Sequence, residues 1–180
     1  GSVIGTVISN SPAILSSELP QAIDNQVFTS ILPDPGLRMV KESYKTGTNT
    51  IKNAVSQNES FDWNITYYND SGNDDTEAVI TDTYPVGVTV SEVWHTWNTA
   101  TVNNSNPPTV SGGAVDITSL VSIDTNARTI TLDIVALRGQ NLHYLEGGTI
   151  RLVTTTASSG LNTGDQLVNQ VNGLYSNGTT

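Results

Sequence analysis

The chain has no cysteine among its 180 residues, few basic side chains and no long apolar run. Without cysteine it forms neither disulfides nor thiolate-ligated metal sites. Its 7 Lys and Arg residues against 17 Asp and Glu residues give a formal net charge of −10. This charge disfavours nucleic-acid binding, because phosphate recognition depends on basic groups. No stretch of apolar residues is long enough to cross a bilayer, so we expect no membrane insertion of this segment.

The residues that dominate are Thr, Ser, Asn, Val and Ile, a mixture typical of sheets and turns. The stretch FDWNITYYND is the clearest strand, because apolar and polar side chains alternate along it. We expect one set of its side chains to be buried and the other exposed: Phe61, Trp63, Ile65 and Tyr67 inside, and Asp62, Asn64 and Thr66 outside.

Further strands are predicted in GLRMVKESY, VITDTYP, VGVTVSEVW, ARTITLDIV, GTIRLVTTT and DQLVNQVNGLY. In ARTITLDIV, the residues Ile130, Leu132 and Ile134 are expected on one face of the strand. Segments such as NDSGNDD, NNSNPP and EGG separate the strands and are typical of turns and loops. No segment has a sustained helical period. The pattern predicts an all-β protein, an antiparallel Greek-key, Ig-like β-sandwich.

The first 36 residues differ from the rest, so we divide the chain into an N-terminal strand and linker at 1–36 and a sandwich domain at 37–180. The spacing of residues 5–10 resembles that of residues 164–169, which is a weak internal repeat. We expect the segment from Val3 to Leu15 to pair with another copy of the fold, with 16–36 as an extended linker. The segment is either the remnant of a preceding repeat or a donor strand inserted into an adjacent subunit.

Three polar residues share strand faces with apolar neighbours that belong in a core. Lys41 follows Met39 at a spacing of two, Asp82 follows Ile80, and the third residue, Asn169, precedes Val171 at the same spacing. Side chains two apart on a strand point to the same face, so all three are expected inside. An ionised side chain in an apolar core is costly unless it is paired.

A resemblance rests on the order of these motifs: Lys41 after an apolar run, then SQNESFDWNITYYNDSG, VITDTYPVGVTV, LEGGTIRLVTTT and GDQLVNQVNGLYSN. The stretch from about Leu37 to Ser176 resembles the conserved-repeat domain of prokaryotic surface proteins, known as domain of unknown function eleven. It also resembles the related isopeptide-forming domain of Gram-positive pilins. The resemblance implies an intramolecular amide bond between Lys41 and Asn169, with Asp82 as its catalyst. The alternative is a buried hydrogen-bonded or ionic cluster without a covalent bond.

The loop NDSGNDDTE gathers carboxylates that suit calcium: Asp70, Asp74, Asp75 and Glu77. Their order does not fit the EF-hand pattern, and a solvated acidic hairpin loop is the alternative. No other cofactor is expected.

In EVWHTW, Trp94 and Trp97 could form a sugar-stacking platform, and His95 could ligate a metal. The alternative places these aromatic side chains in the core, and a histidine-rich metal site is disfavoured because His143 is the other histidine of the chain. No nucleophile elbow, phosphate loop or zinc motif occurs. We therefore expect no turnover enzyme, and at most a single autocatalytic crosslinking event.

N-glycosylation sequons begin at Asn58, Asn64, Asn69, Asn103 and Asn177. A chain so rich in Asn, Ser and Thr contains such triplets by chance, so they are candidates only.

Together these features predict an extracellular structural module of the cell surface. It would be a subunit of a pilus-like filament, or a repeat of a stalk, whose partners are other copies in a head-to-tail homopolymer or in tandem. The alternative is an adhesin domain that binds a carbohydrate or a receptor.

Overall fold

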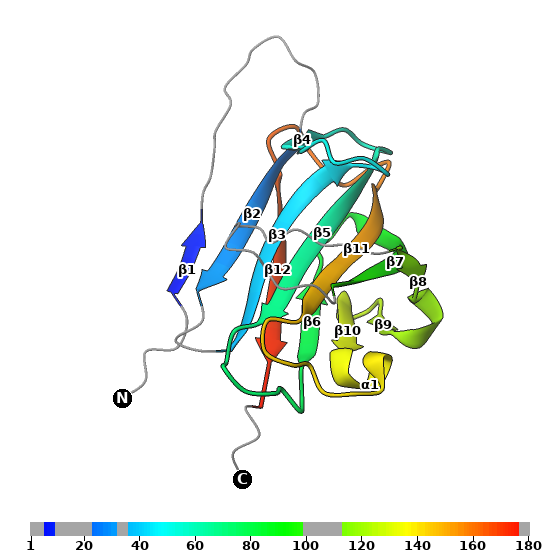
Figure 1. The fold of residues 1–180 in the computed structure, drawn as a ribbon. Helices are drawn as coiled ribbons and strands as arrows, with labels where there is room; N and C mark the ends of the chain where they lie inside the picture. Colours follow the sequence, from blue (N-terminus) through cyan, green and yellow to red (C-terminus); the bar gives the residue numbers. More distant parts are fainter. Residues whose placement is uncertain (1–5, 10–22, 32–35, 99–112, 177–180) are drawn as a thin grey trace.

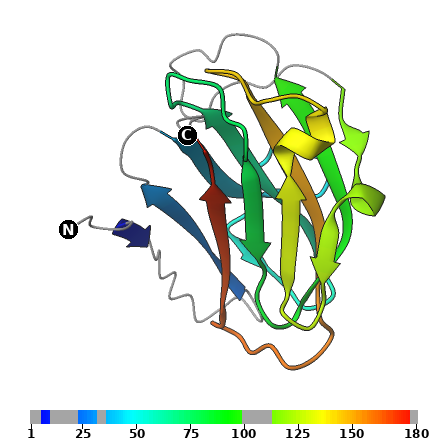
Figure 2. The same ribbon diagram turned by 90° about the horizontal axis from the view of Figure 1, so that it is seen from below.

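The computed structural model describes residues 6–9, 23–31, 36–98 and 113–176, and these form two β-sheets packed face to face (Figures 1 and 2). The five-stranded sheet contains, in order, β3 (Leu37–Lys45), β5 (Ser60–Asn69), β11 (Gly147–Thr156), β7 (Val88–Asn98) and β8 (Val115–Asp116). The seven-stranded sheet has the order β1 (Thr6–Ser9), β2 (Ile23–Ile31), β12 (Gln166–Leu174), β6 (Val79–Thr83), β10 (Thr129–Asp133) and β9 (Ser122–Asp124), with β4 (Ala54–Val55) paired to β2.

The architecture confirms the predicted Ig-like β-sandwich. The chain changes sheet repeatedly, for example between β5 and β6, β6 and β7, β10 and β11, and β11 and β12, so strands of both sheets contribute to one core. The described pairings are antiparallel except for that of β2 with β12, which is parallel. Two short helices complete the fold, η1 (Thr118–Leu120) and α1 (Ile134–Arg138). Neither described helix is long and apolar enough to cross a membrane.

Strand β5 lies between β3 and β11, and its inward face confirms the predicted register. Its four apolar and aromatic side chains are buried: Phe61, Trp63, Ile65 and Tyr67. On the outer face, Asn64 and Thr66 are half-buried. The prediction for Asp62 is wrong, because its side chain is only 1% exposed. The turn after β3 covers this carboxylate, and the Gly47 amide donates to Asp62 Oδ2 at 2.8 Å.

The segment EGG was expected to be a turn, but Gly147 and Gly148 are the first residues of β11. A Cβ atom at Gly147 would lie 2.0 Å from the Tyr67 carbonyl oxygen, and one at Gly148 would lie 2.6 Å from the Thr96 carbonyl oxygen. Glycine is therefore needed here for the close approach of β5 and β7 to β11.

Helix α1 was not expected, because ARTITLDIV has the alternation of a strand. Ile130 and Leu132 are buried in β10 as predicted, but the strand ends at Asp133. The Asp133 carboxylate accepts a hydrogen bond from the Ala136 amide at 2.8 Å, and Gly139 in the left-handed conformation closes the helix. This N-cap starts a helical turn that still buries Ile134.

The N-terminal segment differs from the prediction. Residues 23–31, which were expected to belong to an extended linker, form β2 in the seven-stranded sheet. Strand β1 (Thr6–Ser9) pairs with β2 of its own chain, and the expected pairing of Val3–Leu15 with another copy of the fold stays a prediction. The two segments that resemble each other in sequence, near β1 and β12, both pair with β2. The remaining residues of 1–36 up to Pro35 lie outside the described residues.

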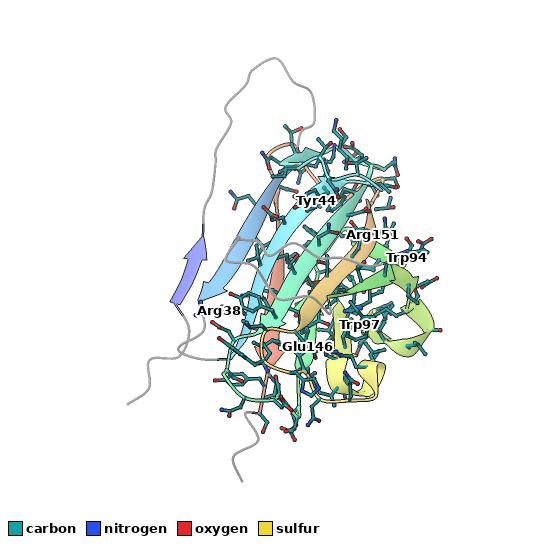
Figure 3. The ribbon with its side chains drawn as sticks, in the orientation of Figure 1. Arg38, Tyr44, Trp94, Trp97, Glu146 and Arg151 are labelled. Carbon is teal, nitrogen blue, oxygen red and sulfur yellow. The ribbon has the colours of Figure 1, made fainter. Side chains whose placement is uncertain are left out.

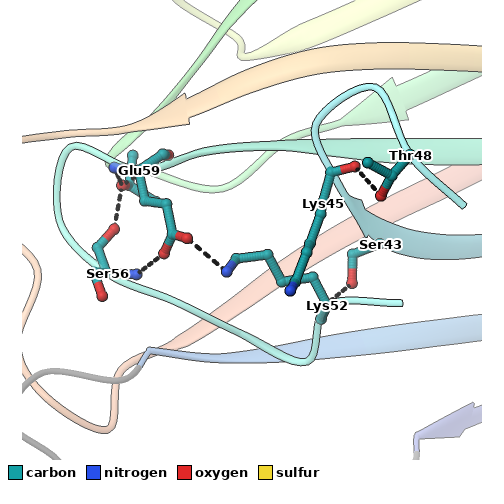
Figure 4. A network of polar contacts seen from close by, with 7 residues as sticks. Ser43, Lys45, Thr48, Lys52, Ser56 and Glu59 are labelled. Atoms are coloured by element: carbon teal, nitrogen blue, oxygen red, sulfur yellow. Dashed lines mark hydrogen bonds and ion pairs between the residues drawn. The ribbon is translucent and has the colours of Figure 1, made fainter. Parts of the chain in front are cut away.

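The connection from β3 to β5 is held by the polar network in Figure 4. The Thr48 hydroxyl donates to the Lys45 carbonyl oxygen at 2.9 Å. Lys52 Nζ lies 2.6 Å from Glu59 Oε1, and the Ser56 amide donates to Glu59 Oε2 at 2.7 Å. The Ser43 hydroxyl donates to the Lys52 carbonyl oxygen, which ties this connection to β3.

His95 of β7 faces the core, where its Nε2 atom is 2.8 Å from the hydroxyl oxygen of Tyr67 of β5. Its side chain is fully buried, and within residues 36–98 and 113–176 its Nδ1 atom has no hydrogen-bond partner. Burial, and to a smaller extent the positive charge of Arg138, lowers the pKa of His95 to about 3. The other histidine, His143, pairs with Asp74 at 2.9 Å on the surface, so the two histidines do not form a joint metal site.

We predict that His95 makes the domain acid-sensitive. Its folded-state pKa lies below its unfolded value near 6.5, so stability is present above pH 6.5 and is lost as the pH falls toward 3. Between pH 7.5 and pH 4.5 this group should cost about 2–3 kcal/mol of unfolding free energy.

Urea unfolding of the wild type and of His95→Gln at both pH values measures this loss. The variant should lose less stability, because glutamine does not titrate in this range. The carboxyl groups titrate in both proteins and cancel in the comparison. Equal losses in the two proteins would contradict the prediction.

Candidate functional site: the Lys41, Asp82 and Asn169 cluster

The three residues predicted to face the core are all buried in it. Lys41 is 2% exposed, Asp82 is 0% exposed and Asn169 is 1% exposed. Lys41 projects from β3, at the edge of the five-stranded sheet, while Asp82 and Asn169 come from β6 and β12, which are neighbours in the other sheet. Asp82 lies opposite Val171, two residues along β12 from Asn169. The cluster therefore joins the two layers of the sandwich.

The central contact is an ion pair between Lys41 Nζ and Asp82 Oδ2, in which the amine also donates a hydrogen bond. Lys41 Nζ lies 5.3 Å from the centroid of the Trp63 ring, within the range of a cation–π contact. Three polar atoms of the cluster, Asp82 Oδ1 and both amide atoms of Asn169, have no hydrogen-bond partner among the described residues. Unpaired buried polar atoms are rare in native proteins, so each of them calls for an explanation.

Burial moves both titrating groups toward their neutral forms. It lowers the pKa of Lys41 to about 8, against the opposing effect of the Asp82 charge. It also raises the pKa of Asp82, which is opposed by Lys41 and to a smaller degree by the nearby Asn169 amide. A neutral amine is a nucleophile, and a protonated carboxyl group donates a hydrogen bond and a proton. The cluster thus contains an amine, an acid and an amide carbonyl group, which are the groups that an amide exchange requires.

The other two lysines of the chain do not reach this cluster. Lys45 is exposed, and Lys52 forms the ion pair with Glu59 described above (Figure 4). Lys41 is therefore the lysine available to an electrophile inside the core.

Trp63 is a member of the site that the sequence did not reveal. Its inward position was predicted, but its place beside Lys41 depends on the alignment of β3 with β5, in which Lys41 lies opposite Ile65 and Ser43 lies opposite Trp63. The alternation within each strand gives the face of a residue but not its neighbour across the strands. To predict the contact between Lys41 and Trp63, one would have had to recognise from the turn at 45–50 that β3 pairs with β5.

The acidic loop does not gather its carboxylates. Asp70 pairs with Arg38, and Asp74 pairs with His143. Asp75 is buried, and its Oδ1 atom accepts hydrogen bonds from the amides of Glu77 at 3.1 Å and Ser176 at 2.9 Å. The part of the chain that the structure describes holds no group of three or more His, Cys, Asp or Glu side chains arranged for a metal. Calcium binding by Asp70, Asp74, Asp75 and Glu77 stays a prediction.

The two tryptophans of EVWHTW lie on opposite faces of β7 and do not form one platform. Trp97 faces the core, where its ring centroid is 3.8 Å from that of His95, and it packs against the buried cluster. Trp94 faces outward, opposite Arg151. A saccharide platform made of both rings is therefore excluded by the twofold alternation of the strand.

The described sequons differ in accessibility. Asn58 is exposed in a turn with a φ of 58°, and Asn64 is half-buried on the outer face of β5. Asn69 is only 1% exposed, and its Nδ2 atom donates to the carbonyl oxygens of Asn73 at 2.7 Å and Leu142 at 2.8 Å. The folded domain cannot carry a glycan on this amide, so the candidate at Asn69 is wrong. Asn103 and Asn177 lie outside the described residues.

Comparisons with known proteins show the fold. Family models and curated protein sequences give no match to this chain, so its membership of the conserved-repeat family stays a prediction. A solved structure of the C-terminal domain of the Streptococcus agalactiae AgI/II polypeptide BspA is similar over 97% of this chain, with 10% identity and a TM-score of 0.54. The chain spans about half of that structure, 55% of its length.

Two pilin structures show a looser likeness. The T6 backbone pilin of serotype M6 Streptococcus pyogenes has 14% identity and a TM-score of 0.49, over 83% of this chain and 31% of the pilin. The major pilin SpaD from Corynebacterium diphtheriae has 11% identity and a TM-score of 0.43, over 83% of this chain and 46% of the pilin.

We predict that the ion pair is costly to break but not costly to replace. In an Asn169→Leu background, which removes any crosslink, Lys41→Met should reduce the unfolding free energy by about 3 kcal/mol, because Asp82 is left unpaired in the core. The double change Lys41→Met with Asp82→Leu should recover most of this loss, because it removes both charges.

Guanidinium unfolding at pH 7 measures all three proteins. Additive losses in the double variant would show that the two side chains do not act as a pair. The prediction would then be wrong.

Proposed function

We propose that this chain is an extracellular structural module, a repeat or subunit of a cell-surface filament or stalk, toughened by an intramolecular bond between Lys41 and Asn169. The observation that carries the proposal is the burial of Lys41, Asp82 and Asn169 together at the interface of the two sheets. The similarity of the sandwich to the BspA C-terminal domain supports the fold on which the proposal depends. A buried lysine with a lowered pKa beside a buried carboxyl group with a raised pKa favours a reactive site over a purely structural contact.

The bond would form by amide exchange. The neutral Nζ atom of Lys41 attacks Cγ of Asn169, and the Asp82 carboxyl group donates a hydrogen bond to the amide oxygen as negative charge develops there. The Cγ–Nζ bond forms and the Cγ–Nδ2 bond breaks. Asp82 takes a proton from Nζ and delivers one to Nδ2, so that ammonia leaves and Asp82 ends in its starting form.

Burial contributes to this reaction in two ways. It stabilises the neutral amine and the neutral acid, as the pKa directions show. It also excludes bulk water from the reacting atoms, and water would otherwise compete with the amine for Asn169. The Asn169 amide has no hydrogen-bond partner among the described residues. The exchange would replace this unpaired primary amide with an amide bond to Lys41.

The position of the bond suits a load-bearing role. It would connect β3, at the edge of one sheet, to β12, in the interior of the other. The two layers of the sandwich could then not separate without breaking a covalent bond. Such protection acts on the rate of unfolding and on proteolysis more than on the equilibrium.

Intact-mass spectrometry tests the bond. We predict that the wild type is lighter than its sequence mass by one ammonia, while Asp82→Ala, Lys41→Arg and Asn169→Ala each have the full mass of their own sequence. Lys45→Arg is the matched control, because this exposed lysine lies outside the cluster, and it should keep the ammonia loss.

Tandem mass spectrometry of a digest should place the loss in a branched peptide that joins the segments around Lys41 and Asn169. A folded wild type of full mass would contradict the covalent proposal and would leave a non-covalent ionic cluster. Loss of ammonia from Lys41→Arg would locate the reaction elsewhere in the chain and would equally overturn it.

A further inference from the structure

The outer face of the five-stranded sheet carries a row of side chains that the core chemistry does not use. Glu42 of β3 lies opposite Asn64 of β5, Asn64 lies opposite Arg151 of β11, and Arg151 lies opposite Trp94 of β7. Side chains opposite one another on neighbouring strands are about 5 Å apart, so the row forms one continuous surface. Figure 3 shows Tyr44, Arg151 and Trp94 along this side of the sheet.

Trp94 and Arg151 form the aromatic part of the row. The Arg151 guanidinium carbon lies 5.2 Å from the centroid of the Trp94 ring, and Trp94 Nε1 donates to Glu92 Oε2 at 2.7 Å. The indole is thus fixed in orientation while it remains partly exposed. At the other end, the half-buried Tyr44 donates its hydroxyl hydrogen to Glu42 Oε2 at 2.6 Å.

Beneath Arg151, two acceptor oxygens on this face have no donor within the described part of the chain. They are Asp62 Oδ1 and Asn64 Oδ1. Asp62 is only 1% exposed, and the guanidinium of Arg151 lies 3.8 Å from its Oδ2 atom, which is too far for a hydrogen bond. Leaving such an oxygen buried without a donor costs about 1–3 kcal/mol. Arg151, with a side chain 31% exposed, lies near the Asp62 carboxylate and opposite Asn64 on the neighbouring strand.

We propose that this row is a binding site for a neutral saccharide. A sugar ring has an apolar face for an indole and several hydroxyl donors at its edge, which match the Trp94 ring and the unpaired oxygens of Asp62 and Asn64. Outward displacement of the Arg151 side chain opens these oxygens to the ligand. The carboxylates of Glu42, Asp62 and Glu92 on the same face repel anionic sugars, which selects for neutral ones.

The site and the sequon at Asn64 exclude each other. A glycan attached to the Asn64 amide would cover the centre of the row and remove the acceptor geometry. The saccharide proposal therefore applies to the chain without N-glycans, and the protein for its test is produced in a host that does not attach them. The saccharide proposal does not depend on the proposed Lys41–Asn169 bond, because Lys41 lies on the opposite face of the five-stranded sheet, toward the core.

An array of immobilised neutral and sialylated oligosaccharides, followed by fluorescence titration with the neutral glycan that binds, tests the site. Wild type should bind neutral glycans, and Trp94→Ala should weaken the affinity by at least about tenfold, as loss of a stacking aromatic does. Thr131→Ala is the matched control, because Thr131 is a half-buried residue on the outer face of the other sheet, and it should bind as wild type does.

The variant Asn64→Ala distinguishes a loss of glycan affinity from a loss of fold stability. It removes a buried oxygen without a donor, so its thermal unfolding midpoint should equal or exceed that of the wild type while its affinity falls about tenfold. This variant keeps the test valid if Trp94→Ala does not fold. Absence of glycan binding by the wild type, binding restricted to sialylated glycans, or unchanged affinity in Asn64→Ala would each overturn the proposal.

Discussion

The removal of Lys41 and Asp82 from water is the constraint on which the rest of the structure depends. Each charge alone would be very costly in this core, so the two strands that carry them must lie opposite each other across the sandwich. This requirement couples β3 of one sheet to β6 of the other and fixes how the layers face each other. Hydrophobic burial drives the collapse of the sheets, and the ion pair adds a specific contact between β3 and β6 across the core.

The same burial bears on which of two states the cluster adopts, an ion pair or a neutral amine with a neutral acid. A pair that stays ionic is a structural contact of modest net worth, since apolar residues could replace it. A pair that exchanges its proton becomes an amine and an acid beside an amide. The pKa directions of both groups favour the neutral forms, and the Asn169 amide is buried in the same cluster.

Alternation within single strands could be predicted from the sequence, and it placed Lys41, Asp82 and Asn169 in the core together with the inward face of β5. The burial of Asp62 could not be predicted, because the cover comes from a turn whose amide, at Gly47, binds the carboxylate. The pairing of His95 with Tyr67 depends on which strands lie side by side, and that information is absent from a local pattern. Strand β2 was hidden by its mixture of polar and apolar residues, and it is ordered by its pairing with β12 and β4.

Strand β12 divides its hydrogen bonds between two partners. Residues Gln166–Asn169 pair in parallel with β2, and residues Gln170–Leu174 pair in antiparallel fashion with β6. Tension applied to the end of β12 in the direction away from β6 would open the second set one bond at a time, as a zipper opens. At Asn169 the hydrogen-bonding partner changes from β6 to β2, so the separation from β6 ends there. Asn169 thus lies at the boundary between the β2-paired and the β6-paired parts of β12, and a bond from Lys41 to this residue would anchor the strand where its partner changes.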